Sequence, residues 1–108
     1  MATKEWMLDV MDVATAAGRG SEIRYVDVRE QCEWDAGHIA GSIHIPMGDI
    51  HSRFEELDRG TPIVVVCQVG QRSALVADFL AAHGYDANNL EGGLDAWASH
   101  GHSLVVGD

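Results

Sequence analysis

Residues 63–66 are the most constraining segment of the chain, an uninterrupted run of one isoleucine and three valines that leads directly to Cys67. An apolar run without alternation is typical of a central strand in a parallel sheet, because helices cover both faces of such a strand. A tight loop containing Gly70 follows the cysteine, and a helical pattern follows the loop over residues 73–83. The segment therefore predicts an α/β domain with a thiol at the carboxyl end of a buried strand.

The loop after this strand has the character of an anion-binding site. Ligands of open parallel sheets bind beyond the carboxyl ends of the strands, where Cys67 is placed. The amino end of the next helix presents unpaired N–H groups and the positive end of the helix dipole, which both favour negative charge. A thiol ionises more readily there, and the thiolate is its nucleophilic form. We therefore interpret the chain as a cysteine-dependent enzyme or a sulfur carrier.

Strand and helix patterns alternate along the rest of the chain. Strands are predicted at residues 6–8, 23–28, 42–45, 63–66 and close to residue 90, and helices at residues 10–17, 30–36, 47–57, 73–83 and 93–100. This alternation favours a three-layer α/β/α fold around a largely parallel five-stranded central sheet. With 108 residues and no repeat or linker, we expect one domain over residues 1–108.

Composition argues against several classes of function. The chain has 17 acidic and 7 basic residues and a net charge of −10, which disfavours nucleic acids and anionic membranes as partners. Its first residues lack a basic segment followed by a long apolar core, so we expect no secretory signal and a cytoplasmic location with Cys32 and Cys67 reduced. No cofactor is expected, and no metal either, since His100 and His102 lack a third ligand.

Three separated motifs stand out along the chain. The first comprises Asp27-Val28-Arg29 with Glu33-Trp34 and the run GHIAGSIHIP at residues 37–46; the second is CQVGQRS at residues 67–73, and the third is EGGLDAW at residues 91–97. Their order and spacing, over residues 25–101, resemble those of the single-domain rhodaneses, a thiosulfate sulfurtransferase-like family. The resemblance implies a rhodanese-like α/β/α fold and a sulfurtransferase activity.

The resemblance also implies a mechanism. The Cys67 thiolate would attack the sulfane sulfur of thiosulfate, expel sulfite and pass the resulting persulfide sulfur to cyanide or a thiol, in a ping-pong reaction. The loop amides would hydrogen-bond the thiolate and the persulfide, and the planar fork of Arg72 would hold the sulfonate oxygens. Gly70 would permit the turn, because a Cβ there could clash or forbid a positive φ. The residues expected to bind substrate or persulfide are Gln68, Val69, Gly70, Gln71, Arg72 and Ser73.

Other polar residues of the motifs are interpreted as structural support. Asp27, Arg29 and Glu33 are expected to form an architectural charge network, and His38 to pin a loop after a helix-ending glycine. Arg72 has a second interpretation, as an ion-pair partner of an acidic residue beneath the loop. Cys32 is interpreted as an inert thiol.

The length of the loop separates two chemistries. Cys67 and Arg72 form a Cys-x4-Arg pattern, whereas the related phosphatases and arsenate reductases have one residue more, which makes room for a tetrahedral oxyanion. Sulfur transfer is therefore favoured. Gln68 and Gln71 stand where efficient thiosulfate enzymes carry additional basic residues, so we expect weak thiosulfate binding and consider a protein persulfide as donor.

Three alternatives remain open from the sequence. The first is a persulfide relay module that loads sulfur for a partner protein and turns over thiosulfate slowly. The second is a phosphatase or arsenate reductase, which the short loop disfavours. The third is a binding or regulatory domain on an inactive scaffold, which the intact Cys67 loop disfavours.

Overall fold

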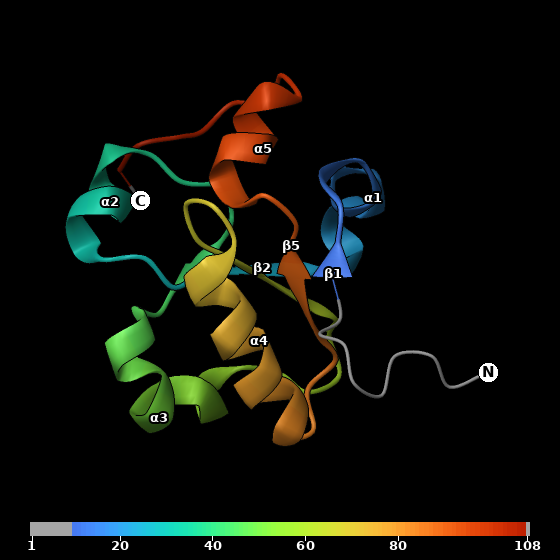
Figure 1. The fold of residues 1–108 in the computed structure, drawn as a ribbon. Helices are drawn as coiled ribbons and strands as arrows, with labels where there is room; N and C mark the ends of the chain where they lie inside the picture. Colours follow the sequence, from blue (N-terminus) through green and yellow to red (C-terminus); the bar gives the residue numbers. More distant parts are fainter. Residues whose placement is uncertain (1–9, 108) are drawn as a thin grey trace.

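The computed structural model describes residues 10–107, which form a five-stranded sheet with helices packed against it (Figure 1). The strands are β1 (Val10–Met11), β2 (Arg24–Asp27), β3 (Ile43–His44), β4 (Ile63–Val66) and β5 (Ala87–Leu90). The helices are α1 (Val13–Arg19), α2 (Gln31–Ala36), α3 (Ile50–Arg53), α4 (Gln71–Ala82) and α5 (Gly93–Ser99), with 3-10 turns at Gly20–Glu22, Met47–Asp49 and Phe54–Glu56. The strand order is β1-β5-β4-β2-β3 and these strands pair in parallel, which confirms the predicted sheet.

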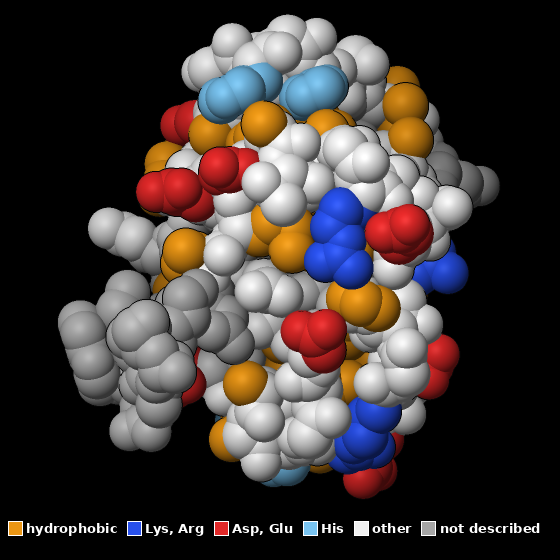
Figure 2. Space-filling model, turned by 90° about the vertical axis from the view of Figure 1, so that its right-hand side faces the viewer, with side chains coloured by type: hydrophobic (Ala, Val, Ile, Leu, Met, Phe, Trp, Pro, Cys, Tyr) orange, Lys and Arg blue, Asp and Glu red, His pale blue; other side chains and the backbone are white. Residues whose placement is uncertain are grey.

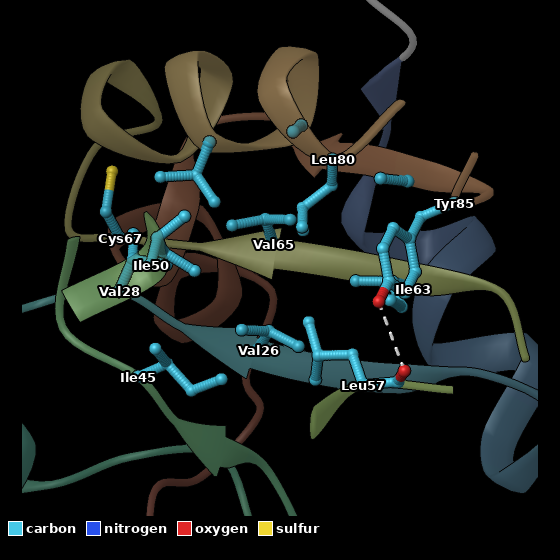
Figure 3. Packing of buried hydrophobic residues seen from close by; sticks show 13 residues of the cluster. Val26, Val28, Ile45, Ile50, Leu57, Ile63, Val65, Cys67, Leu80 and Tyr85 are labelled. Atoms are coloured by element: carbon cyan, nitrogen blue, oxygen red, sulfur yellow. Dashed lines mark hydrogen bonds between the residues drawn. The ribbon is translucent and has the colours of Figure 1, made fainter. Parts of the chain in front are cut away.

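β4 is the central strand, and its four residues are buried. Ile63 and Val65 pack in one hydrophobic cluster with side chains of α3 and α4, part of which Figure 3 shows. Val64 and Val66 pack in a second cluster with side chains of α1 and α5. Because successive residues of a strand point to opposite faces, this division places helices on both sides of the sheet. The three-layer arrangement predicted from the apolar run is confirmed.

The first described strand corrects a prediction. Residues 10–11 were expected to begin a helix, but Val10 and Met11 pair in parallel with Asn89 and Leu90 of β5. The helix begins only at α1, because the Asp12 side chain accepts a hydrogen bond from the Thr15 N–H at 2.8 Å and caps it. Pairing with a distant strand thus overrides the local helical pattern. The strand predicted at residues 6–8 lies outside the described residues.

The single helix predicted over residues 47–57 is also wrong. The segment consists of a 3-10 turn, the short helix α3 and a second 3-10 turn. Ile50 and Leu57 are buried in the core, so the apolar spacing was identified correctly. The Tyr85 hydroxyl donates to the carbonyl oxygens of Phe54 and Leu57, at 2.8 and 3.2 Å (the latter dashed in Figure 3), and so satisfies carbonyls at the end of this segment.

α4 begins two residues earlier than predicted. Its first residue is Gln71, and Gly70 precedes it in the left-handed conformation. Arg72 and Ser73 therefore belong to the first turn of the helix. The loop that joins β4 to α4 is correspondingly short, comprising residues 67–70.

Charged side chains are dispersed over the face of the molecule on the side of α1. Figure 2 shows acidic and basic groups there, scattered among hydrophobic and uncharged ones.

Among residues 10–107, no helix has the length and apolar character needed to cross a membrane. The same residues contain no group of three or more His, Cys, Asp or Glu side chains arranged to hold a metal ion.

The amino end of α5 packs against the backbone that follows β4. The Leu94 N–H donates to the Cys67 carbonyl oxygen at 2.9 Å, and the Asp95 N–H donates to that of Gln68 at 3.0 Å. Gly93 has a φ of +62°, and a Cβ at this position would lie 2.5 Å from the Cys67 oxygen. A glycine is therefore required both by the conformation and by the close approach of the two backbones.

We expect Gly93→Ala to lower the free energy of unfolding by about 2–5 kcal/mol. The left-handed backbone contributes about 1–2 kcal/mol of this loss and overpacking against the backbone about 1–3 kcal/mol. Urea unfolding measures the change. Gly101→Ala is the matched control, since Gly101 has a φ of +84° but open space around its Cα. Only the conformational cost is expected there, and equal losses in the two variants would contradict the packing argument.

Candidate active site

Cys67 follows β4 directly, at the carboxyl edge of the sheet, and is only 1% exposed. Figure 3 shows its sulfur pointing from the end of β4 toward α4. Gly70 turns the chain with a φ of +103°. A Cβ on Gly70 would meet its nearest neighbour only at 3.5 Å, so the positive φ requires the glycine and steric crowding does not.

Three polar groups of the loop and of α4 contact the Cys67 sulfur. The Gly70 N–H donates to Sγ at 3.2 Å, and the Ser73 N–H donates to it at 3.3 Å. The Ser73 hydroxyl oxygen lies 3.2 Å from the same sulfur. These contacts place neutral dipoles around the position where a thiolate charge would form.

These contacts change the acidity of the thiol. Burial is the largest single influence and raises the pKa of Cys67. The hydroxyl and amide of Ser73 act in the opposite direction, as do the amides of Gly70 and Val69. Together the hydrogen bonds outweigh burial and lower the pKa of Cys67 below that of an ordinary thiol. The arrangement therefore favours a nucleophilic thiolate.

Arg72 is engaged by Glu33 of α2. Its two terminal nitrogens donate to the two carboxylate oxygens of Glu33 at 2.8 and 3.0 Å. The hydrogen bond from Arg72 is the main cause that lowers the pKa of Glu33 to about 2, and the same pair raises the pKa of Arg72. The structure thus shows the ion pair that was the second interpretation of Arg72. The guanidinium fork expected to hold a sulfonate is occupied by a carboxylate.

Gln68 connects the loop to a buried charge network. Its side-chain oxygen accepts from Arg29 at 3.2 Å, and its side-chain nitrogen donates to Asp95 at 2.7 Å. Arg29 in turn forms a buried ion pair with Asp27 at 2.8 Å and donates to the Gly37 carbonyl oxygen at 2.7 Å. Asp27 and Arg29 therefore lie close to the loop, and the charge of each is balanced by the other.

His38 is buried and packs against Trp34 of α2. Its ring stacks on that of Trp34 with centroids 3.5 Å apart, and its Nδ1 lies 2.9 Å from the Trp34 carbonyl oxygen. Its backbone exchanges two hydrogen bonds of 2.8 Å with Val105. None of the hydrogen bonds of His38 within residues 10–107 reaches the Cys67 loop. These contacts suit the expected role in pinning a loop.

The remaining predicted residues are at the surface. Val69 is 51% exposed and Gln71 is exposed, so both side chains lie at the outer side of the loop. Cys32 is exposed in the first turn of α2 as a free thiol.

Sequence reasoning missed Asp95, which accepts from Gln68, and a second residue, Asn89, that contacts the loop. Asn89 of β5 is only 7% exposed. Its side-chain nitrogen donates to the Gly70 carbonyl oxygen at 3.0 Å, and its side-chain oxygen accepts from the Ser73 hydroxyl. The available signal was a polar residue close to the carboxyl end of a predicted strand, which is where sites form in parallel sheets.

A hollow of about 220 Å³ lies at the opposite edge of the sheet. Arg24, Ile43 and Ile63, which line it, are the first residues of β2, β3 and β4, whereas Cys67 follows the last residue of β4. No residue of the Cys67 loop lines this hollow. The hollow and the Cys67 loop therefore lie at opposite ends of β4.

Comparison with known proteins agrees with this arrangement. Residues 9–100 match the family described as Rhodanese-like domain. YtwF of Bacillus subtilis, named as a candidate sulfurtransferase, is 36% identical over 95 residues, which cover 83% of this chain and 92% of the relative. A sulfurtransferase of Allochromatium vinosum is 34% identical over 86 residues, which cover 79% of this chain and 80% of the relative.

Solved structures agree as well. The crystal structure of a rhodanese-related protein from Thermoplasma volcanium superposes with a TM-score of 0.89 at 30% identity, and the match covers 92% of this chain and 99% of that one. The resemblance noted in the three motifs is thereby confirmed, and so is the fold that it implies. The chain belongs to the rhodanese-like domain family.

Proposed function

We propose that the protein is a sulfurtransferase that carries a sulfane sulfur as a persulfide on Cys67. The observation that carries this proposal is the set of hydrogen-bond donors around Sγ, with the amides of Gly70 and Ser73 at 3.2 and 3.3 Å. Membership of a family whose relatives are named sulfurtransferases supports the same activity.

The proposed reaction has two steps. The Cys67 thiolate attacks the outer sulfur of the donor and forms a sulfur–sulfur bond, while the donor's own bond to that sulfur breaks and its electron pair leaves with sulfite or a thiolate. An acceptor, cyanide or a thiolate, then attacks the outer sulfur and restores the Cys67 thiolate. Neither step needs an external oxidant or a general base, because sulfur moves as a neutral atom between two anionic nucleophiles. The amides of Gly70 and Ser73 stabilise the thiolate at the start and end of the cycle.

The charges near the loop favour a donor other than free thiosulfate. Arg72 is paired with Glu33 and Arg29 with Asp27, so neither guanidinium offers an unbalanced positive charge. The chain as a whole has a net charge of −10, which repels a dianion. We propose that thiosulfate is a weak donor and that a protein persulfide is the better one, as in a persulfide relay.

Two free cysteines accord with a reducing, cytosolic setting, which we propose for the protein.

The phosphatase alternative receives no support from the site. Four residues separate Cys67 from Arg72, and the guanidinium that would bind phosphate oxygens is held by Glu33. Activity on an aryl phosphate that disappears in Cys67→Ser would revive this alternative.

We expect wild-type protein to gain the mass of one sulfur atom when it is incubated with a persulfidated cysteine desulfurase, and to lose it when cyanide is added. Intact mass spectrometry measures both steps. Cys67→Ser should gain nothing, because the nucleophile is absent, whereas Cys32→Ser should load like the wild type. Loading that persists in Cys67→Ser, or no loading from any donor, would contradict the proposed function.

We expect Glu33→Gln to lower the KM for thiosulfate about fivefold, which corresponds to about 1 kcal/mol. The substitution removes the carboxylate charge that Arg72 faces and keeps an oxygen for the cap of α2, where Glu33 accepts from the Glu30 N–H. Asp35→Asn, an equal change of charge on an exposed site of the same helix, is the control and should change KM less than twofold. Equal changes of KM in the two variants would show that only the overall charge of the protein affects thiosulfate binding.

We expect the alkylation of Cys67 by iodoacetamide to reach half of its maximal rate at a lower pH in the folded protein than in the urea-unfolded protein. The hydrogen bonds to Sγ lower the pKa of the thiol in the folded state, and only the thiolate reacts. The Cys32→Ser background makes Cys67 the one reactive thiol. A midpoint at or above that of the unfolded chain would mean that burial outweighs the hydrogen bonds.

A further inference from the structure

Asn89 is tied to the loop by both polar atoms of its side chain. It lies on β5, which pairs with β4 on one side and with β1 on the other, and is only 7% exposed. Its Nδ2 donates to the Gly70 carbonyl oxygen at 3.0 Å, and its Oδ1 accepts from the Ser73 hydroxyl. Asn88, the preceding residue, points to the opposite face of the sheet, and its side chain has one weak contact of 3.5 Å with Asp86.

The orientation of the Asn89 amide is fixed by its partners. The Gly70 carbonyl can only accept hydrogen bonds, so the nitrogen of the amide must face it, and the oxygen must therefore face Ser73. Asn89 thus holds Gly70 and Ser73, and these two residues also contact Sγ. The Gly70 N–H and the Ser73 N–H donate to the sulfur, and the Ser73 Oγ lies 3.2 Å from it.

The hydrogen bond that the Ser73 hydroxyl donates to Asn89 holds the Ser73 oxygen beside Sγ. With its proton directed to Asn89, the hydroxyl has lone pairs free to accept the S–H of a neutral Cys67. A side chain on a strand is more rigid than the loop, so it can hold these positions through a reaction cycle.

We propose that Asn89 is a positioning residue for the Cys67 thiolate, because it holds Gly70 and Ser73 in the places from which they contact Sγ. This inference rests on the proposed function only in that Cys67 is taken as the reacting group. Asn89 itself makes no hydrogen bond to the sulfur among the described residues, so it acts through its two partners.

The test compares Asn89→Leu with Asn88→Leu in a Cys32→Ser background. Asn89→Leu keeps the side-chain size and removes both hydrogen bonds, and it should raise the pKa of Cys67, measured by iodoacetamide alkylation against pH, by about one pH unit. Sulfur loading near neutral pH should slow about tenfold and recover at high pH, with KM changed less than twofold. Asn88→Leu, on the same strand, should change none of these values. The charged groups around the loop, Arg72 with Glu33 and Asp95, stay in place in both variants.

A pKa of Cys67 that stays unchanged or falls in folded Asn89→Leu would overturn the inference. A slow rate that does not recover at high pH would overturn it too, since it would indicate a general loss of structure. If Asn89→Leu does not fold, as judged by urea unfolding, the smaller polar variant Asn89→Ser replaces it with the same expected direction. Alkylation measures the pKa of Cys67 and does not require sulfur transfer. The alkylation test of Asn89 therefore remains valid even if the wild-type protein carries no sulfur.

Discussion

The structure depends on how the backbone polar groups beyond β4 find partners. β4 is buried on both faces, so the N–H and C=O groups just past its end cannot all turn to water and need partners within the protein. The carbonyls of Cys67 and Gln68 accept from α5, and that of Gly70 accepts from Asn89. The amides of Gly70 and Ser73 have the Cys67 sulfur as their partner. The same hydrogen bonds that complete the fold therefore prepare the thiol for ionisation.

The hydrogen bonds to the sulfur in this solution come from neutral dipoles, the amides of Gly70 and Ser73, and Arg72 adds an electrostatic interaction with Cys67. The nearby guanidinium groups of Arg72 and Arg29 are each paired with a carboxylate. Fixed dipoles at 3.2–3.3 Å act on charge located at Sγ and weakly on charge farther away. A site of this kind stabilises negative charge on the Cys67 sulfur itself. Its effect is also less sensitive to salt than that of an exposed charge would be.

Local signals in the sequence were sufficient for the centre of the fold. The unbroken apolar run of β4, the glycine of the loop and the following helical spacing predicted the site's strand, turn and helix, and with them the position of Cys67. β1 was missed because residues 10–11 become a strand only by pairing with β5. The helix predicted over residues 47–57 is divided into two 3-10 turns and α3, and the apolar spacing alone did not distinguish these from one helix. At β1 a distant partner therefore decides the local conformation.

The same limit applies to the site. The thiol and its loop amides are neighbours in the sequence and were predicted, whereas the partners of the loop side chains are not. Glu33 is 39 residues from Arg72, and Asn89 is 16 residues from Ser73. Motif spacing could place Glu33 only in a general charge network, and nothing in the spacing distinguished Asn89 from Asn88. The parallel register between β4 and β5, which pairs Val65 with Asn89, is what brings the amide beside the loop. The surroundings of the loop side chains are therefore determined less by the loop sequence than by residues that the fold brings from β5 and α2.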